Sequence, residues 1–480
     1  MSTELPYDRK DKYAILKYAQ LLTGKSLRMV IQDKLAPDVA IRLGKGGFGT
    51  MVEDLYFDYR PNSDAQADFP EAGIELKTTP LKIVQKGLVS KERLVFNIIN
   101  YMEEHQQVFR TSSFWKKNAE LLLLFYIHDK EKALLDYQFK IVRLWRFPET
   151  DLKIIIDDWN TIVKKIREGK AHELSEGDTM YLGACTKGAT KASLRSQPFS
   201  EDFAMQRAFS LKSKYLNFIV EQSLNGDEHA IDEREYEYLL SESVLSREEY
   251  ELSEKVEPPV GEQIVRSLSE YKQGQTFEDL VVERFAAYIG WSEAELIAHF
   301  KLNIKPNAKN RYQVICNRIM GVTGKYIEEF EKGEVSMKTV MLQHNGNLKE
   351  SMSFQQIKYQ EIVHEDWLES YFYQALSKRF FFVVFQQDNR AVPRLFKVKF
   401  WTMPLADLMI AEAFWEDTKS KIAADSFDNF IKIADDQICH VRPKARDSQD
   451  LMLTASGRME KKKAYWLNSS YIKEVVLTEI

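Results

Sequence analysis

Four segments of the first half of the chain recur in the same order in the second half, and this repeat constrains the fold more than any other feature. The clearest pair sets 207–215 beside 463–471, and another sets Asp68-Phe-(x5)-Glu75-Leu-Lys77-Thr beside Glu329-Phe-(x5)-Ser336-Met-Lys338-Thr. The recurring pairs are 68–78 with 329–339, 91–96 with 349–354, 121–125 with 381–385, and 207–215 with 463–471. A chain of 480 residues is long enough for two units that each bury a sizeable core. The repeat therefore predicts two folded units of one architecture.

An acidic stretch separates the two halves. Residues 227–257 hold twelve acidic and three basic side chains, and Pro258-Pro259 follows them. Such a composition is typical of a solvated linker, part of which is helical. We therefore predict domains over 1–225 and 261–480, joined by an acidic linker over 226–260.

The secondary-structure signals are mixed. Residues 13–22 and 277–288 have helical periodicity, whereas the apolar runs 121–126 and 380–385 have the length of buried strands. Strand and turn signals alternate through the centre of each half. The fold class is therefore α/β or, more broadly, mixed α+β.

Composition excludes several classes of protein. The three cysteines, Cys185, Cys316 and Cys439, are far apart, which argues against a disulfide framework or a zinc site and favours a reducing cytoplasm. No apolar run reaches the roughly 18 residues of a membrane span, so no membrane association is expected. The formal net charge is −5, but the acidic stretch accounts for more than all of it, which leaves the rest slightly basic. Nucleic-acid binding therefore stays open.

A short motif supplies candidate catalytic groups. Ile74 to Thr78 is predicted as a strand, preceded by Gly73 and closed by Pro80. The side-chain period of a strand places Glu75 and Lys77 on one face. Carboxylate oxygens are the ligands that Mg²⁺ prefers, and a bound Mg²⁺ activates water for attack on phosphate. With Asp68 seven residues earlier, the motif indicates phosphodiester hydrolysis; the alternative is a solvated ion pair on an exposed strand.

A glycine-rich lead, residues 44–49, precedes a predicted helix that begins near Thr50. Glu53 falls in its first turn, where the helix dipole favours an acid. The glycines lack the strand before them and the Lys-Ser/Thr pair of a nucleotide-binding loop, so we reject that reading.

The run from Lys45 to Leu81 closely resembles MutH, the GATC-specific nicking endonuclease of mismatch repair. The resemblance implies that Asp68, Glu75 and Lys77 form the active site and that Glu53 completes the metal cluster. MutH has a further active-site lysine after a Thr-Ser segment, and 111–118 is similar to that segment. The position falls on Lys117, with Lys116 as the alternative; a basic flank at a strand entry is the other interpretation.

Two later segments are similar to DNA-contacting parts of MutH. The resemblance implies a DNA-reading loop over 181–192, in which Lys187 matches a family lysine and Cys185 stands where an arginine is expected. Residues 207–212 match a second segment, with Ser210 in place of the family tyrosine that lies near the adenine methyl group. The residues assigned to DNA contact in this half are Lys187, Lys191, Arg207, Ser210 and Lys212. The two departures weigh against any transfer of methylation sensing.

The second half lacks one of the metal-binding acids but keeps residues of the DNA-reading loop. Ser336, a poor Mg²⁺ ligand, stands at the position of Glu75. Arg442-Pro-Lys444-Ala keeps the DNA-loop pattern, in which arginine suits guanine and lysine suits phosphate. Trp466 stands opposite Ser210 in the repeat. We predict that Arg442, Lys444 and Trp466 bind DNA without cutting it; the alternative is that the two cations are ordinary surface bases.

Segments spread over nearly the whole chain resemble the staphylococcal family of GATC-cutting type II restriction endonucleases. Examples are 90–101, 169–177, 349–354 and 439–443. The resemblance implies two MutH-like, restriction-endonuclease-like domains, each a mixed sheet flanked by helices. It also implies Mg²⁺-dependent cleavage of both strands of double-stranded DNA at GATC, leaving 5′-phosphate ends, with the second domain as a noncatalytic effector.

One active site per chain cannot cut two strands at once. The strands are therefore cut in sequence, or two chains self-associate on DNA that carries two sites. Two other functions stay open at this point: a MutH-like strand-nicking repair endonuclease and a noncatalytic DNA-binding regulator.

Overall fold

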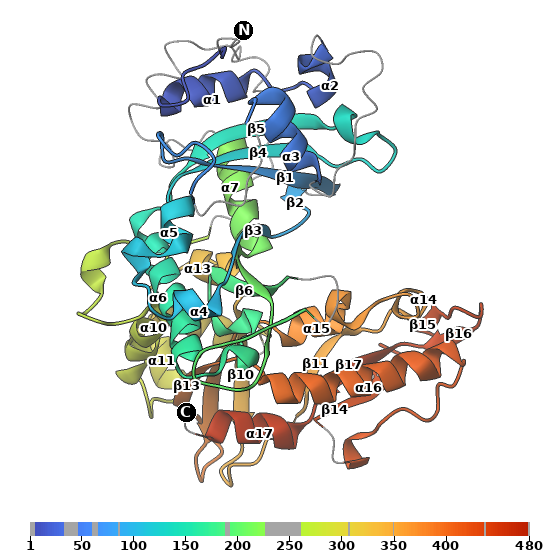
Figure 1. Cartoon of the computed structure of the whole chain (residues 1–480). Coiled ribbons are helices and arrows are strands. Elements are labelled where there is room, and N and C mark those ends of the chain that lie inside the picture. Colours follow the sequence, from blue (N-terminus) through green and yellow to red (C-terminus); the bar gives the residue numbers. More distant parts are fainter. Residues whose placement is uncertain are drawn as a thin grey trace.

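The computed structural model describes residues 5–32, 47–59, 66–84, 87–187, 193–225, 261–305, 308–348, 350–435 and 438–478. The predicted acidic linker, 226–260, and Lys191 lie outside the described residues. No helix in the described ranges is long and apolar enough to cross a membrane. Figure 1 shows the first half as an upper lobe that continues downward through α6 and α7 to the second half.

The first half contains a mixed four-stranded sheet in the order β2-β1-β4-β5. Its strands are β1 (Glu75–Val84), β2 (Gly87–Ser90), β4 (Leu121–Ile127) and β5 (Gln138–Trp145). β1 and β4 run parallel, and both outer pairs are antiparallel. The first six residues of β4 are buried, as expected for a continuous apolar run in a central strand. The predicted mixed α+β class is confirmed.

β1 is longer than the sequence predicted, because it continues through Pro80 to Val84. The ladder to β2 begins at Leu81, and just before it the Pro80 carbonyl accepts from the Lys91 N–H over 2.9 Å. Pro80 therefore lies at the end of that ladder, where a missing N–H is tolerated.

Helices cover this sheet, and a smaller sheet lies below it. The helices of the first half are α1 (Lys12–Gln20), α2 (Leu27–Val30), α3 (Gly47–Met51), α4 (Tyr101–Glu104), α5 (Ser113–Asn118), α6 (Glu149–Arg167) and α7 (Ser213–Asn225). The smaller sheet has the order β3-β9-β6, from β3 (Leu94–Ile98), β9 (Arg207–Leu211) and β6 (Leu182–Thr186). Two short strands, β7 (Leu194–Arg195) and β8 (Ala204–Met205), pair beside it.

The second half repeats both sheets of this arrangement, except that its larger sheet has no counterpart of β2 among the described residues. One sheet has β10 (Ser336–Leu342), β12 (Phe380–Gln387) and β13 (Pro393–Trp401), and the other has β11 (Met352–Gln356), β17 (Lys463–Leu467) and β14 (Cys439–Pro443). The register agrees as well: Ser336 lies beside Phe380 on parallel strands, as Glu75 lies beside Leu121. The matching helices are α14 (Tyr359–Ile362), α15 (Tyr371–Leu376), α16 (Leu405–Ala423) and α17 (Ser469–Leu477). The sequence repeat is therefore a repeat of topology.

Four further helices and a hairpin complete the second half. They are α10 (Phe277–Ala286), α11 (Glu293–His299), α12 (Arg311–Ile319) and α13 (Glu328–Lys332), with β15 (Leu451–Leu453) and β16 (Met459–Lys461). The helices predicted over 13–22 and 277–288 correspond to α1 and α10, each of which ends two residues earlier.

The hydrophobic core does not divide at the predicted domain boundary. One cluster belongs to the upper lobe and one to the far part of the second half. The third is continuous from Trp159 of α6 and Tyr215 of α7 to Phe285 of α10 and Phe381 of β12. The two halves therefore share a core, in which α6 and α7 pack against the second half.

Candidate active site

A tight turn brings Asp68 beside Glu75 at the start of β1. Phe69 and Ile74 exchange backbone hydrogen bonds of 2.9 and 3.2 Å across the turn, and Gly73 has φ +71°, which favours glycine. The Asp68 N–H donates to Glu75 Oε2 over 3.2 Å, and the Leu76 N–H donates to Asp68 Oδ2 over 2.9 Å. The two predicted metal ligands are thus fixed next to each other.

Two lysines converge on Glu75. The Lys77 ammonium donates to Glu75 Oε1 over 2.7 Å, and the Lys117 ammonium lies 3.6 Å from the same oxygen. Lys117 is on α5, whose N-terminus is capped by Ser112 and which leads directly into β4, the parallel neighbour of β1. Lys116 is exposed on the same helix. The geometry therefore favours Lys117 for the active-site position.

Glu53 reaches the same site from a π-helical turn. α3 ends at Met51, and Val52–Tyr56 continues it as a π-helix, a form that is frequent at functional sites. Because α3 already includes Gly47, three residues before the predicted start at Thr50, Glu53 does not lie in the first helical turn as predicted. Burial, followed by the charge of Asp68, raises the pKa of Glu53 to about 7, while Lys77 opposes the shift. Glu53 is therefore close enough to feel the other groups of the site.

The charges of the site suit a divalent cation. Burial also raises the pKa of Glu75; Lys77 opposes that shift and Asp68 adds to it. Carboxylates that repel one another in a partly dry site are stabilised by a cation, and their oxygens are the ligands that Mg²⁺ prefers. Among the described residues no three acidic, histidine or cysteine side chains are already gathered as a closed metal cluster. Both oxygens of Glu75 accept hydrogen bonds here, and each carboxylate oxygen has a second lone pair that can bind a metal.

The predicted DNA-contact residues of the first half fall into two groups. Lys187 follows the last residue of β6, where its N–H donates to Gln206 O over 2.8 Å, and the rest of the loop, 188–192, lies outside the described residues. Cys185 is buried on β6. The Lys187 position thus stays compatible with a DNA-facing loop.

Arg207, Ser210 and Lys212 are placed differently. Arg207 is buried and donates to Ala184 O over 2.7 Å, and Ser210 is 1% exposed in the middle of β9. The Lys212 ammonium donates to Thr179 O over 2.7 Å and, in the second half, to Gly333 O over 3.0 Å. All three side chains are packed inside the protein in this structure, so we do not carry their DNA-contact role forward.

In the second half one of the two equivalent acids is lost and the other is engaged elsewhere. The register places Ser336 at the position of Glu75. Glu329, which stands for Asp68 in the repeat, accepts hydrogen bonds from the Ile264 and Val265 N–H groups over 3.0 and 2.9 Å. Burial raises its pKa to about 7. This carboxylate holds an incoming segment rather than a metal.

The predicted readout residues of the second half lie together on its surface. The Arg442 guanidinium stacks on Trp466 at 4.2 Å, and the Lys444 ammonium lies 5.9 Å from the same ring. Both cations are exposed. Strand register puts Arg442 at the position of Cys185. Arg442 pairs with Ala464, the second residue of β17, and Cys185 pairs with Ala208, the second residue of β9.

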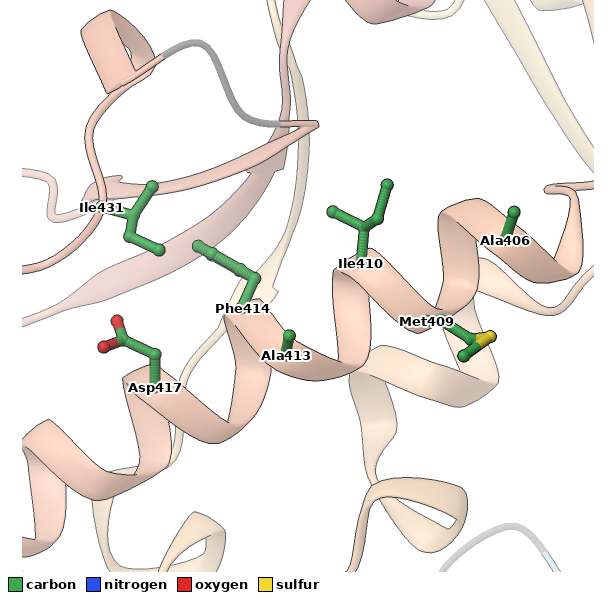
Figure 2. Close-up of a pocket in the computed structure, with 7 residues that line it drawn as sticks. All are labelled: Ala406, Met409, Ile410, Ala413, Phe414, Asp417 and Ile431. Carbon is green, nitrogen blue, oxygen red and sulfur yellow. The ribbon is translucent and has the colours of Figure 1, made fainter.

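An apolar groove of about 630 Å³ lies elsewhere, along α16. Figure 2 shows Met409, Ile410 and Phe414 on the helix, with Ile431 facing Phe414 from the neighbouring chain segment. Asp417 is the single titratable group among its lining residues. Among the described residues, the lining of the groove has one carboxylate, with no second acid and no lysine beside it, so the acidic site at β1 is the catalytic candidate.

The fold and this site define a MutH-like nuclease. The family model described as "DNA mismatch repair enzyme MutH" matches residues 57–158, a span that contains Asp68, Glu75, Lys77 and Lys117. The DNA mismatch repair protein MutH of Shewanella amazonensis is 25% identical over 47% of this chain and 100% of its own length. The MutH protein of Shewanella baltica is 22% identical over 43% of this chain and 92% of its own length.

The similarity to one protein extends through both halves. The type II restriction enzyme Sau3AI of Staphylococcus aureus is 33% identical over 97% of this chain and 98% of its own length. The chain belongs to the family of type II restriction endonucleases that includes Sau3AI.

Proposed function

We propose that the first half hydrolyses both strands of double-stranded DNA at GATC with Mg²⁺ and leaves 5′-phosphate ends. The observation that carries the proposal is the meeting of Asp68, Glu75, Lys77 and Lys117 at one end of β1. Family membership over the whole chain supports DNA as the substrate. GATC itself rests on the sequence resemblance described above. We place this activity in the cytoplasm, where the DNA of a bacterial cell lies.

Each group of the site has a role in this proposal. Asp68, Glu75 and Glu53 would hold the metal through carboxylate oxygens. A bound Mg²⁺ would polarise the phosphate and lower the pKa of a coordinated water. Lys77, freed from Glu75, orients the attacking water, and Lys117 neutralises charge that develops on the scissile phosphate. Burial of the site strengthens both electrostatic effects.

We propose that the second half binds DNA without cutting it and acts as an effector of the first half. Ser336 removes the central ligand, and Glu329 is occupied by backbone N–H groups. Arg442 on Trp466 offers an exposed guanidinium for a base edge or a phosphate. Two chains that share a DNA with two sites would place two active sites on it.

Digestion of a fully sequenced plasmid with Mg²⁺, followed by mapping of the ends, tests the catalytic proposal. We expect double-strand cuts at GATC with 5′-phosphates. Nicks alone would indicate a repair nickase, and band shifts without products would indicate a noncatalytic regulator. Either result would contradict the proposal.

The effector role is tested with DNA that carries one or two sites at matched site concentration. Coupling between two sites typically amounts to about 1–3 kcal/mol, or roughly 5–150-fold. We expect the two-site DNA to be cut faster and the Arg442→Ala variant to lose that advantage. Equal rates on both DNAs would leave the second half with a structural role only.

A further inference from the structure

The part of the second half that corresponds to the catalytic centre keeps the lysine of β1 but has a serine in place of Glu75. The Ser336 N–H donates to Arg379 O over 2.8 Å, just as the Glu75 N–H donates to Glu120 O over 3.0 Å. Lys338 lies beside Phe382 on parallel strands, as Lys77 lies beside Leu123. The strand and its lysine are therefore preserved, and the carboxylate is gone.

Lys338 has no carboxylate partner among the residues that the structure describes. Lys77 pairs with Glu75 at 2.7 Å, but Ser336 offers Lys338 no charge. Burial lowers the pKa of Lys338, and the positive charges of Lys378 and Lys444 lower it further. A partly buried ammonium that faces other cations is unfavourable unless an anion neutralises it.

The other two lysines reach this place from separate elements. Lys378 lies two residues before β12. The next residue is Arg379, whose carbonyl accepts from the Ser336 N–H. Lys378 is not the counterpart of Lys117, which lies on helix α5 five residues after its capping serine. The residue five positions after the capping serine of α15 is Ala375. Lys444 follows β14, and its ammonium donates to Ser353 Oγ over 3.1 Å and to Phe354 O.

We propose that Lys338, Lys378 and Lys444 form a metal-independent site for one phosphate group of the DNA backbone. The site lies where the first half would hold the phosphate that it hydrolyses. This inference rests on the proposed binding of DNA by the second half. Lysines suit phosphate as compact point charges. Because Ser336 replaces the metal-binding Glu75 and Glu329 is held by backbone N–H groups, the phosphate is bound and left intact. Arg442 on Trp466 extends the same surface toward the neighbouring nucleotides.

A single reintroduced acid tests the inference, because it should neutralise Lys338 and so compete with the phosphate. In Ser336→Glu the new carboxylate should pair with Lys338 as Glu75 pairs with Lys77. If Lys338 binds phosphate, this variant binds DNA more weakly although its melting temperature is unchanged or higher. Ser336→Gln, which has the same shape without the charge, is the matched control.

The measurement is metal-free binding of the full chain, in EDTA, to a duplex with two GATC sites over a range of salt concentrations. We expect Ser336→Glu to lower the slope of log K against log salt by about one unit, the value for one lost phosphate contact, and Ser336→Gln to match the wild type. Lys338→Met should also lower the slope, whereas Lys358→Met, which removes an exposed lysine paired with Glu361, should not.

The outcomes separate this inference from the proposed function. If Ser336→Glu and Lys338→Met bind like their controls while Arg442→Ala weakens binding, the phosphate site is refuted and the second half still binds DNA. If Arg442→Ala has no effect either, DNA binding by the second half fails as well. If Ser336→Gln weakens DNA binding as much as Ser336→Glu does, the effect comes from packing, and the phosphate site is refuted.

Discussion

At the scale of single residues, Glu75 is the group on which the site depends, because Lys77, Lys117 and the Asp68 N–H all meet its two oxygens. We expect Glu75→Gln to lower the rate of Mg²⁺-dependent cleavage by about a thousandfold or more, which corresponds to roughly 4 kcal/mol of transition-state stabilisation. DNA affinity in EDTA should be equal or higher, since a negative charge is removed. Single-turnover cleavage and filter binding measure the two effects, and substantial residual cutting would place the active site elsewhere.

The two neighbouring lysines of α5 provide a matched pair. The Lys117 ammonium lies 3.6 Å from Glu75 Oε1, whereas Lys116 is exposed. We expect Lys117→Ala to lower the cleavage rate about 10²–10³-fold, as for other groups that stabilise charge in a transition state, and Lys116→Ala to leave it within about twofold. The reverse pattern would reassign the active-site lysine to Lys116.

The residue types of the site were predictable, but the burial of the predicted DNA-contact residues was not. Asp68, Glu75, Lys77 and Lys117 meet because a strand, a turn and a capped helix have local sequence signals. The packing of Lys212 depends on Gly333, more than a hundred residues away, so no local pattern in the sequence indicates it. A lysine beside a DNA-contact motif is therefore ambiguous until the tertiary contacts are known.

At the scale of secondary-structure elements, the turn before β1 sets the geometry of the site. Gly73 has φ +71°, a conformation that costs an L-residue about 1 kcal/mol. We expect Gly73→Ala to destabilise the chain by about that amount and also to lower cleavage, because the turn holds Asp68 against Glu75. Gly24→Ala is the control: its φ is +76° and its Cβ would meet nothing within 4 Å, but it lies outside the site.

Thermal unfolding and cleavage rates of these two glycine variants separate strain from function. Both should melt at a lower temperature, and the Gly73 variant alone should lose activity after correction for the unfolded fraction. Equal activity of the two variants would show that the turn does not position Asp68.

Elements with a strong pattern were predicted well, and those that depend on context were not. The run 121–126 forms β4 because six apolar residues in a row must be buried on both faces. The predicted end of β1 was wrong, because Pro80 was taken as a terminator although proline is tolerated at the end of the ladder to β2. The π-helical turn that carries Glu53 has no sequence signature that we could use.

At the scale of the whole molecule, the repeat proved more informative than the linker. The register of the parallel strands is the same in both halves, so one fold was used twice. The shared core shows that the first copy packs its α6 and α7 against the second. A boundary chosen from charge alone gives no indication that the two halves are joined in this way.

A buried ion pair links α6 of the first half to α13 of the second half. The Lys332 ammonium is 2.8 Å from Asp151 Oδ2 and 2.6 Å from Glu328 Oε1, and the Lys332 and Asp151 side chains are 3% and 4% exposed. Tyr215 donates to Asp151 over 2.7 Å. Burial lowers the pKa of Lys332, but Asp151 and Glu328 outweigh it and hold the pKa above its usual value. The Lys332 ammonium therefore stays charged at neutral pH; burial raises the pKa of Asp151, and the charge of Lys332 opposes that shift.

We predict that Lys332→Met destabilises the whole chain by about 3–5 kcal/mol, because it leaves a buried carboxylate without its cation. The double variant Lys332→Met with Asp151→Asn should recover part of that loss, since it removes the unpaired charge as well. Lys421→Met, which breaks the more exposed pair with Asp417, should cost less than about 1 kcal/mol. Because the core is continuous across the halves, calorimetry should show the Lys332 variant lowering one common transition. Two separate transitions, of which only one shifts, would mean that the halves are stable independently and that the contact adds little to either.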